Sequence, residues 1–328
     1  MTNIKIALHS LLAVMAIGSV STAQDPDIGF FQEDGQVVIG LADFISREVN
    51  FPQTVFTRNF LSFPGEFFTE DPGFFALGAG SPSIPAGLTA VPGGADVSFN
   101  FLPMTIGQSQ SNLLHWDGQA SGGGAATVAD VDFAPSVDMQ FGVNIAGGGL
   151  ATVTGDDAVV PGVTIGTTSS SGALHIHGIL NVLSLIGGSP TSGVYTVALE
   201  FHVDGLLPSD PVLLAIRSPG LDASTEVAAG SWLNDNYDAL FTDPGDFNGD
   251  GMVDAVDYTV WRDGYSTGDF DIGDYTLWKT NFGATGGAGA IASAPLATVG
   301  FVPEPATATL LALLGLAGCG LPRRWGLR

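Results

Sequence analysis

Six residues between positions 246 and 257 offer oxygen atoms at the spacing of a calcium-binding loop. Such a loop takes side-chain ligands at positions 1, 3, 5, 9 and 12, a backbone carbonyl at position 7 and a glycine at position 6. Gly251 stands at position 6, where the tight turn favours a residue without a side chain. The predicted Ca²⁺ ligands are Asp246, Asn248, Asp250, Met252 (through its carbonyl), Asp254 and Asp257.

An altered copy of this segment follows 17 residues later. Residues 258–262 recur as residues 275–279, and Asp263, Asp271 and Asp274 take positions 1, 9 and 12 of the copy. Tyr265 and Thr267, however, replace the strong ligands at positions 3 and 5. We therefore expect one tight calcium site, with the copy binding weakly or serving only in packing.

Residues 242–284 resemble a dockerin domain. The resemblance rests on the two tandem copies, on aspartate at position 12 of each, and on the short helix that is expected after the first loop at residues 258–262. The segment between the copies is shorter than in that family. The resemblance implies a small α-helical module that is stabilised by calcium and attaches to a cohesin-like partner.

The two ends of the chain are predicted to be targeting segments rather than parts of the fold. Lys5 precedes an apolar run over residues 6–20, and Ser21 and Ala23 are small residues of the kind that signal peptidase accepts. Residues 1–23 are therefore predicted to be a signal peptide. At the other end, residues 302–305 read Val-Pro-Glu-Pro, followed by an apolar stretch over 306–321 and a basic tail.

That C-terminal order of parts, over residues 302–328, resembles the PEP-CTERM sorting signal, also known as the ice-binding-protein C-terminal motif. The resemblance implies processing by an exosortase-type enzyme and delivery to the cell envelope or an extracellular matrix, anchored in the membrane at least transiently. An ordinary C-terminal membrane anchor is the alternative. Residues 285–301, rich in glycine and alanine, are predicted to be a linker.

Composition limits the fold class and the partners. Only 13% of the residues are charged and 46 are glycine, which favours a β-rich fold with many tight turns. The formal net charge of −24 argues against nucleic-acid binding, since such a surface repels phosphates. A single cysteine, Cys319, excludes an internal disulfide.

Residues 24–241 are predicted to form a β-sandwich or jelly-roll-like domain with one late helix. Apolar or alternating runs are separated by turn-forming residues at 95–106, 125–133, 136–145, 172–186, 193–203 and 211–217. Asp222 or Ser224 can cap the late helix, whose apolar face would carry Ala229, Trp232, Leu233, Tyr237, Leu240 and Phe241. The phenylalanine-rich stretch 51–75 is expected to supply core residues more than a glycan-binding platform.

Histidines in this domain provide a second possible metal site. His175 and His177 are two residues apart on one expected strand, so their side chains share a face. A hairpin at residues 187–193 would bring His202 beside His177, and the three imidazoles could bind Zn²⁺ or Cu²⁺ with Asp204 or Asp117. The alternative, hydrogen-bonded strand histidines without a metal, is favoured because no cysteine ligand or helical His motif accompanies them.

No catalytic residues are assigned, since the sequence lacks a nucleophile motif and its acidic residues are too scattered to nominate a pair. The favoured hypothesis is a non-enzymatic surface or matrix protein whose β domain binds a glycan, such as a polysaccharide, or another envelope component. The alternatives are an exported carbohydrate-active enzyme and a histidine-based metal-binding envelope protein.

Overall fold

The computed structural model describes residues 26–107, 109–268 and 270–284. The predicted signal peptide, linker and C-terminal sorting segment lie outside these residues. Among the described residues, none of the helices combines the length and the apolar character that a membrane span requires.

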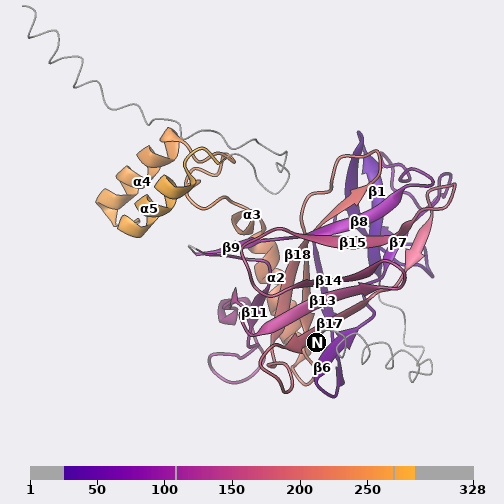
Figure 1. Ribbon diagram of the computed structural model, residues 1–328, viewed down its shortest axis with the longest axis horizontal. Helices are drawn as coiled ribbons and strands as arrows, with labels where there is room; N and C mark the ends of the chain where they lie inside the picture. The colour runs from indigo at the N-terminus through magenta and orange to yellow at the C-terminus, as the bar shows by residue number, and fades with distance from the viewer. Residues whose placement is uncertain (1–25, 108, 269, 285–328) are drawn as a thin grey trace, which may run out of the picture. The chain divides into compact units, whose positions relative to one another are not determined.

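The described residues are mainly β, which confirms the expected β-rich character of the fold (Figure 1). The strands are β1 (Asp27–Glu33), β2 (Gln36–Ala42), β3 (Val49–Asn50), β4 (Val55–Asn59), β5 (Leu61–Phe63), β6 (Glu66–Thr69), β7 (Phe74–Ala76), β8 (Asp96–Leu102), β9 (Met104–Ile106), β10 (Ser109–Ser111), β11 (Leu114–Trp116), β12 (Ala134–Pro135), β13 (Met139–Ile145), β14 (Gly149–Val153), β15 (Val160–Thr167), β16 (Leu174–Ile176), β17 (Ile179–Ser184), β18 (Val194–Val203) and β19 (Val212–Arg217).

Three sheets carry most of these strands. Sheet A has the order β16-β7-β1-β2-β3, and sheet C has the order β14-β13-β17-β6-β5. Sheet B runs β12-β11-β18-β19-β4, with β8 paired to β18 and β15 paired to β8. The strands β9 and β10 form a separate two-stranded ribbon. Each sheet includes strand pairs that are far apart in sequence, such as β7 with β16, β6 with β17 and β4 with β19, so the fold depends in part on long-range pairing.

Phenylalanine rings join the sheets in the main core. Phe201 of sheet B contacts Phe30 and Phe74 of sheet A, with ring centroids 5.1 and 6.1 Å apart. Phe101 of sheet B similarly contacts Phe141 of sheet C at 6.3 Å. Several phenylalanines of the 51–75 stretch are buried, which confirms the core interpretation for them: Phe56, Phe60, Phe68, Phe74 and Phe75.

The expected late helix is present. Helix α2 (Ala223–Asp235) is capped by Asp222, whose side chain accepts a hydrogen bond of 2.8 Å from the Ser224 amide. After Asn236 the chain continues as α3 (Tyr237–Leu240). Leu233 and Leu240 are fully buried in a second core cluster, which packs α2 against sheet B.

The expected strand at 125–133 is wrong, because this segment contains the 3₁₀ helix η1 (Val128–Asp130). The side chain of Asp130 accepts hydrogen bonds from the amide and the hydroxyl of Thr127, which closes a capped turn. Local side-chain bonding of this kind competes with strand pairing.

The predicted strand at 172–186 and its hairpin with 193–203 are also wrong. The segment breaks at residues 177–178, so that β16 lies in sheet A and β17 in sheet C. Strand β18 pairs instead with β11, β19 and β8. Because β18 is buried along almost its whole length, it needs neighbours at both edges, and the apolar strands β8 and β19 supply them.

Two further helices, α4 (Ala255–Thr267) and α5 (Ile272–Asn281), form the helical module, residues 243–284. Each of the repeated tryptophans forms a hydrogen bond with the other copy. Trp261 of α4 donates a hydrogen bond of 2.8 Å to the Asp271 carbonyl, and Trp278 of α5 donates one of 2.6 Å to the Asp254 carbonyl. Asp254 and Asp271 are the N-caps of α4 and α5. The tryptophan of each helix therefore binds the N-cap residue of the other helix.

Replacing Phe201 with alanine should lower the free energy of unfolding by about 3–5 kcal/mol, because the ring is fully buried between sheets A and B. The matched control is Phe63→Ala, whose ring is 37% exposed and whose loss should cost about 1 kcal/mol or less. Urea unfolding of both variants measures the difference. Similar losses in the two variants would contradict the core described here.

Candidate metal centre

Asp27, Gly73 and His177 lie in one row across three strands of sheet A. Strand β1 pairs with β7 so that Ile28 lies beside Phe74, and β7 pairs with β16 so that Phe74 lies beside Ile176. Asp27 and Gly73 each come one residue before these pairs, and His177 comes one residue after Ile176. Continuing the register by one residue therefore aligns the three. Gly73, in the middle, has no side chain, so the side chains of Asp27 and His177 can meet above it.

The space over Gly73 is filled by the two flanking side chains. A Cβ at this position would lie 2.7 Å from Asp27 Oδ1 and 2.8 Å from His177 Nε2. His175, two residues before His177, projects from the same face of β16. Sheet pairing therefore gathers one carboxylate and two imidazoles from segments almost 150 positions apart.

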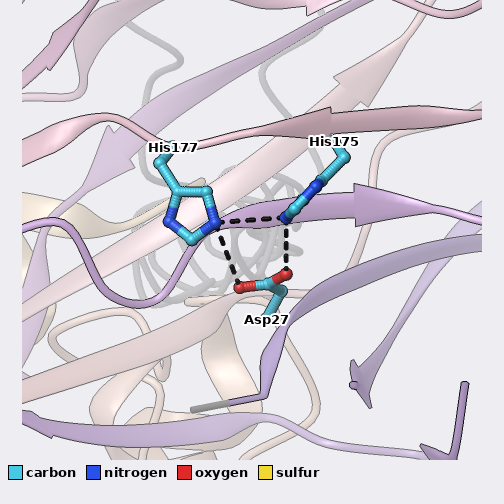
Figure 2. A group of neighbouring side chains, drawn as sticks. All are labelled: Asp27, His175 and His177. Carbon is cyan, nitrogen blue, oxygen red and sulfur yellow. Dashed lines mark hydrogen bonds and ion pairs between the residues drawn. The ribbon is translucent and has the colours of Figure 1, made fainter. Parts of the chain in front are cut away.

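Figure 2 shows the three side chains pointing toward one another. The Nε2 atoms of His175 and His177 are 3.1 Å apart, and His175 Nε2 lies 3.3 Å from Asp27 Oδ2. His177 Nε2 is 4.0 Å from Asp27 Oδ1. All three residues offer a ligand atom within 4.8 Å of the others, an arrangement that can hold a metal ion.

Hydrogen bonds around the site fix the ring of His177 and one oxygen of Asp27. His177 Nδ1 lies 3.0 Å from the carbonyl oxygen of Glu70, which can only accept, so Nδ1 carries the hydrogen and the lone pair of the neutral ring is on Nε2, where it can accept from His175 or bind a metal. The Gly73 amide donates to Asp27 Oδ1 over 3.0 Å. Without a metal, a proton on His175 Nε2 satisfies the short contact with His177.

Asp27 is a buried acid with an incomplete set of hydrogen bonds. Its side chain is 1% exposed, and Oδ2 accepts no hydrogen bond from the described residues. Burial raises the pKa of the Asp27 carboxyl above its ordinary value, and the charges of His177 and His175 only partly offset this effect. A buried oxygen without a donor is costly, and it faces the two imidazoles.

Aromatic packing holds the other imidazole. The His175 ring stacks on Phe44 with centroids 4.0 Å apart and meets the edge of Phe75 at 5.7 Å. Burial lowers the pKa of His175 below its ordinary value, more than the Asp27 charge raises it. The net lowering of the His175 pKa favours a neutral imidazole, which is the form that binds metal.

The other histidines lie elsewhere. His202, on β18, faces Ser98 across the sheet, and its Nε2 lies 2.9 Å from Glu200 Oε2 and 3.0 Å from the Asn100 amide nitrogen. The prediction that it lies beside His177 was wrong, because β17 and β18 belong to different sheets. His115 contacts the Ser192 carbonyl at 3.2 Å.

The predicted calcium loop is closed by its own carboxylates. Asp246 accepts hydrogen bonds from the amides of Gly249 and Gly251 at 2.7 and 2.8 Å, and Asp257 accepts from those of Phe247 and Asp254 at 2.8 and 2.7 Å. Asp246 and Asp257 are both buried. The other predicted ligands lie between these two carboxylates: Asn248 and Asp250 at bends of the loop, Met252 after them, and Asp254 at the N-cap of α4.

The first half of the second copy does not form a loop. Residues 263–267, at positions 1 to 5 of that copy, belong to α4 instead. Asp263 pairs with Arg262 at 2.8 Å, and Asp271 caps α5. The expectation that the copy serves in packing agrees with the reciprocal tryptophan bonds.

Comparison with known proteins gives no relative from which a function can be carried over: the chain matches no protein-family model and no curated protein. The site must therefore be interpreted from its own geometry. Sequence reasoning missed Asp27, although one signal was available, since an acid at the head of the apolar strand Asp27–Glu33 is an unusual choice for a buried position.

In metal-free protein at pH 7, Asp27→Asn should raise the free energy of unfolding. The buried carboxylate ion destabilises the folded state, whereas the amide is neutral and its oxygen can still accept the Gly73 hydrogen bond. Because the folded pKa of Asp27 lies above 3.8, the wild-type carboxyl takes up a proton as the pH falls, and the advantage of the variant should shrink toward zero near pH 4.

Urea unfolding of both proteins in the presence of a chelator, between about pH 7 and pH 4, measures this difference. A variant that is less stable than wild type at pH 7, or a difference that does not change with pH, would contradict the burial of an ionised Asp27.

Proposed function

We propose that this protein is an exported, metal-binding protein of the bacterial cell envelope, and that its β domain binds one transition-metal ion, Zn²⁺ or Cu²⁺, through Asp27, His175 and His177. The single observation that carries the proposal is the convergence of two imidazoles on the buried Asp27 carboxylate, one oxygen of which accepts no hydrogen bond from the described residues. It corresponds to the metal-binding alternative that the histidine spacing indicated, with Asp27 in place of His202.

The spacing of the donors supports a single ion. Two donors that lie about 2.0–2.1 Å from one ion in a tetrahedral arrangement are about 3.3 Å apart. The contacts of 3.1 and 3.3 Å made by His175 Nε2 are close to that value. Two imidazole nitrogens with one carboxylate oxygen suit zinc, copper and iron, and not calcium or magnesium, which prefer oxygen ligands.

Metal binding would also neutralise the buried negative charge of the site. An ion among the three donors would replace the proton shared by the imidazoles and would compensate the buried Asp27 carboxylate. The hydrogen bond from His177 Nδ1 to Glu70 already orients one ring for this role, as outer partners of metal-binding histidines generally do.

Calcium binding by the helical module is a second proposal. Two features support it: the spacing of the six oxygen ligands, and the burial of Asp246 and Asp257. The Asp246 carboxylate accepts hydrogen bonds from the amides of Gly249 and Gly251, and the Asp257 carboxylate accepts from those of Phe247 and Asp254. The module would then be a dockerin-like attachment unit with one Ca²⁺. Its cohesin-like or polysaccharide partner belongs to the same proposal.

The location and the finer architecture are also proposed. The tripartite N-terminal pattern supports export, and the Pro-Glu-Pro motif with its apolar stretch and basic tail supports PEP-CTERM sorting by an exosortase-type enzyme. Residues 24–241 are proposed to be a β-sandwich, an arrangement supported by a main core that draws side chains from sheets A, B and C.

Zinc retention tests the proposed metal centre. After equilibration with Zn²⁺ at pH 7.5 and dialysis, the mature chain should retain one zinc ion per molecule, and Asp27→Ala or His177→Ala should lose it. Gly73→Ala should also bind more weakly, because its methyl group would occupy the space between the two ligands. Metal analysis and calorimetry measure the stoichiometry.

His202→Ala is the matched control, since it removes an imidazole that lies outside the cluster. It should retain zinc as wild type does. Loss of zinc from His202→Ala alone, or retention by both ligand variants, would show that the ion binds elsewhere.

Calcium titration of the zinc-loaded chain should give a stoichiometry near one that vanishes in Asp246→Ala, because this carboxylate supplies the first ligand and organises the turn. Asp263→Ala, at the equivalent position of the helical copy, should bind calcium as wild type does. Calorimetry of the full chain distinguishes the cases, and two equivalent calcium ions would refute the assignment of one site.

A further inference from the structure

We infer that the proposed metal centre binds the carboxylate group of an external molecule at an open coordination position, assisted by Arg47. The inference rests on the proposed function. It names the ligand class that this surface of the β domain would recognise.

The described residues place three ligands at the site, too few to complete the coordination of the ion. Asp27 offers one oxygen, because the other accepts the Gly73 amide hydrogen bond, and each histidine offers one nitrogen. Asp71 approaches His177 at Nδ1, 3.7 Å away, which is the ring edge turned from the other two ligands. Zinc and copper take four or more ligands, so at least one position remains for a molecule from solution.

The open position faces solvent on the imidazole side. The side chains of His175 and His177 are 25% and 27% exposed, whereas that of Asp27 is 1% exposed. An ion held among them would be covered by protein on the Asp27 side and nearest to solvent past the two rings. An external donor would therefore approach it past the imidazoles.

The charge at this position favours an anion, in contrast to the acidic chain as a whole. A divalent ion exceeds the charge of Asp27 by one unit. Arg47 adds a second positive charge: its guanidinium lies 4.8 Å from the centroid of the Phe44 ring, which itself stacks on His175. Arg47 is exposed and forms no ion pair with the described residues, so its charge is available to a ligand.

A carboxylate matches both partners, since it binds transition ions through oxygen and pairs with guanidinium. Two sources supply this group: small organic acids, and acidic glycans that contain uronic acids. Asp71 beside His177 and the acidic chain as a whole favour one carboxylate over a densely charged polyanion such as nucleic acid.

Cobalt loading of the full chain gives a direct test, because the visible absorption of Co²⁺ reports its ligands. In buffer without carboxylates, we expect acetate and trigalacturonate each to change the spectrum in a saturable way, whereas glucose should not. Tighter binding of trigalacturonate than of acetate would identify acidic glycans as the source. Equal affinities would identify small carboxylates.

Arg47→Gln separates this inference from the metal site itself. The variant should retain one Co²⁺ per chain and bind the carboxylate about three- to five-fold more weakly, the effect of one partly exposed charge. An unchanged affinity would refute the role of Arg47. A chain that retains cobalt but shows no spectral response to either carboxylate would overturn the inference, and a chain that retains no cobalt would overturn the proposed function instead.

Discussion

The candidate site depends on one constraint: the carboxylate of Asp27 is buried at the start of a strand of sheet A. Its neighbour in the sheet is a glycine, which leaves space for a histidine side chain on the far side. Gly73 separates it from His177 in the row across β1, β7 and β16. Among the described residues, this buried acid accepts a hydrogen bond at one oxygen only, and it makes the fold less stable than an apolar residue of similar size would. A loss of stability of this kind is typical of functional positions, and for this reason we base the proposed function on this site.

The helical module is organised by a different interaction. Each tryptophan of the repeat donates its indole hydrogen to the carbonyl of the aspartate that caps the other helix, so each copy holds the start of its partner. The backbone of Val253 also pairs with Gly283 and Ala284, which brings the end of the module back to its first loop. The second copy can therefore lose its ligands and still be needed for the shape of the first.

The sequence predicted the features that local patterns determine. Alternating or apolar runs located β8, β13, β18 and β19. The capping residue Asp222 and the apolar face predicted α2. The 17-residue repeat indicated the helical module. The shared face of His175 and His177 follows from the strand period. Long-range pairing was not predictable: Gly178 marks the point where the chain leaves sheet A for sheet C, and no local signal placed Asp27 beside histidines far along the sequence.

X-ray absorption spectroscopy at the zinc edge of the zinc-loaded protein tests the central claim most directly, since it reports the type and distance of the ligands whatever their position in the sequence. The account predicts two imidazole nitrogens and at least one oxygen at about 2.0–2.1 Å, with one imidazole lost in His177→Ala. A first shell of oxygen ligands alone, or one that His177→Ala leaves unchanged, would contradict a centre built from Asp27, His175 and His177.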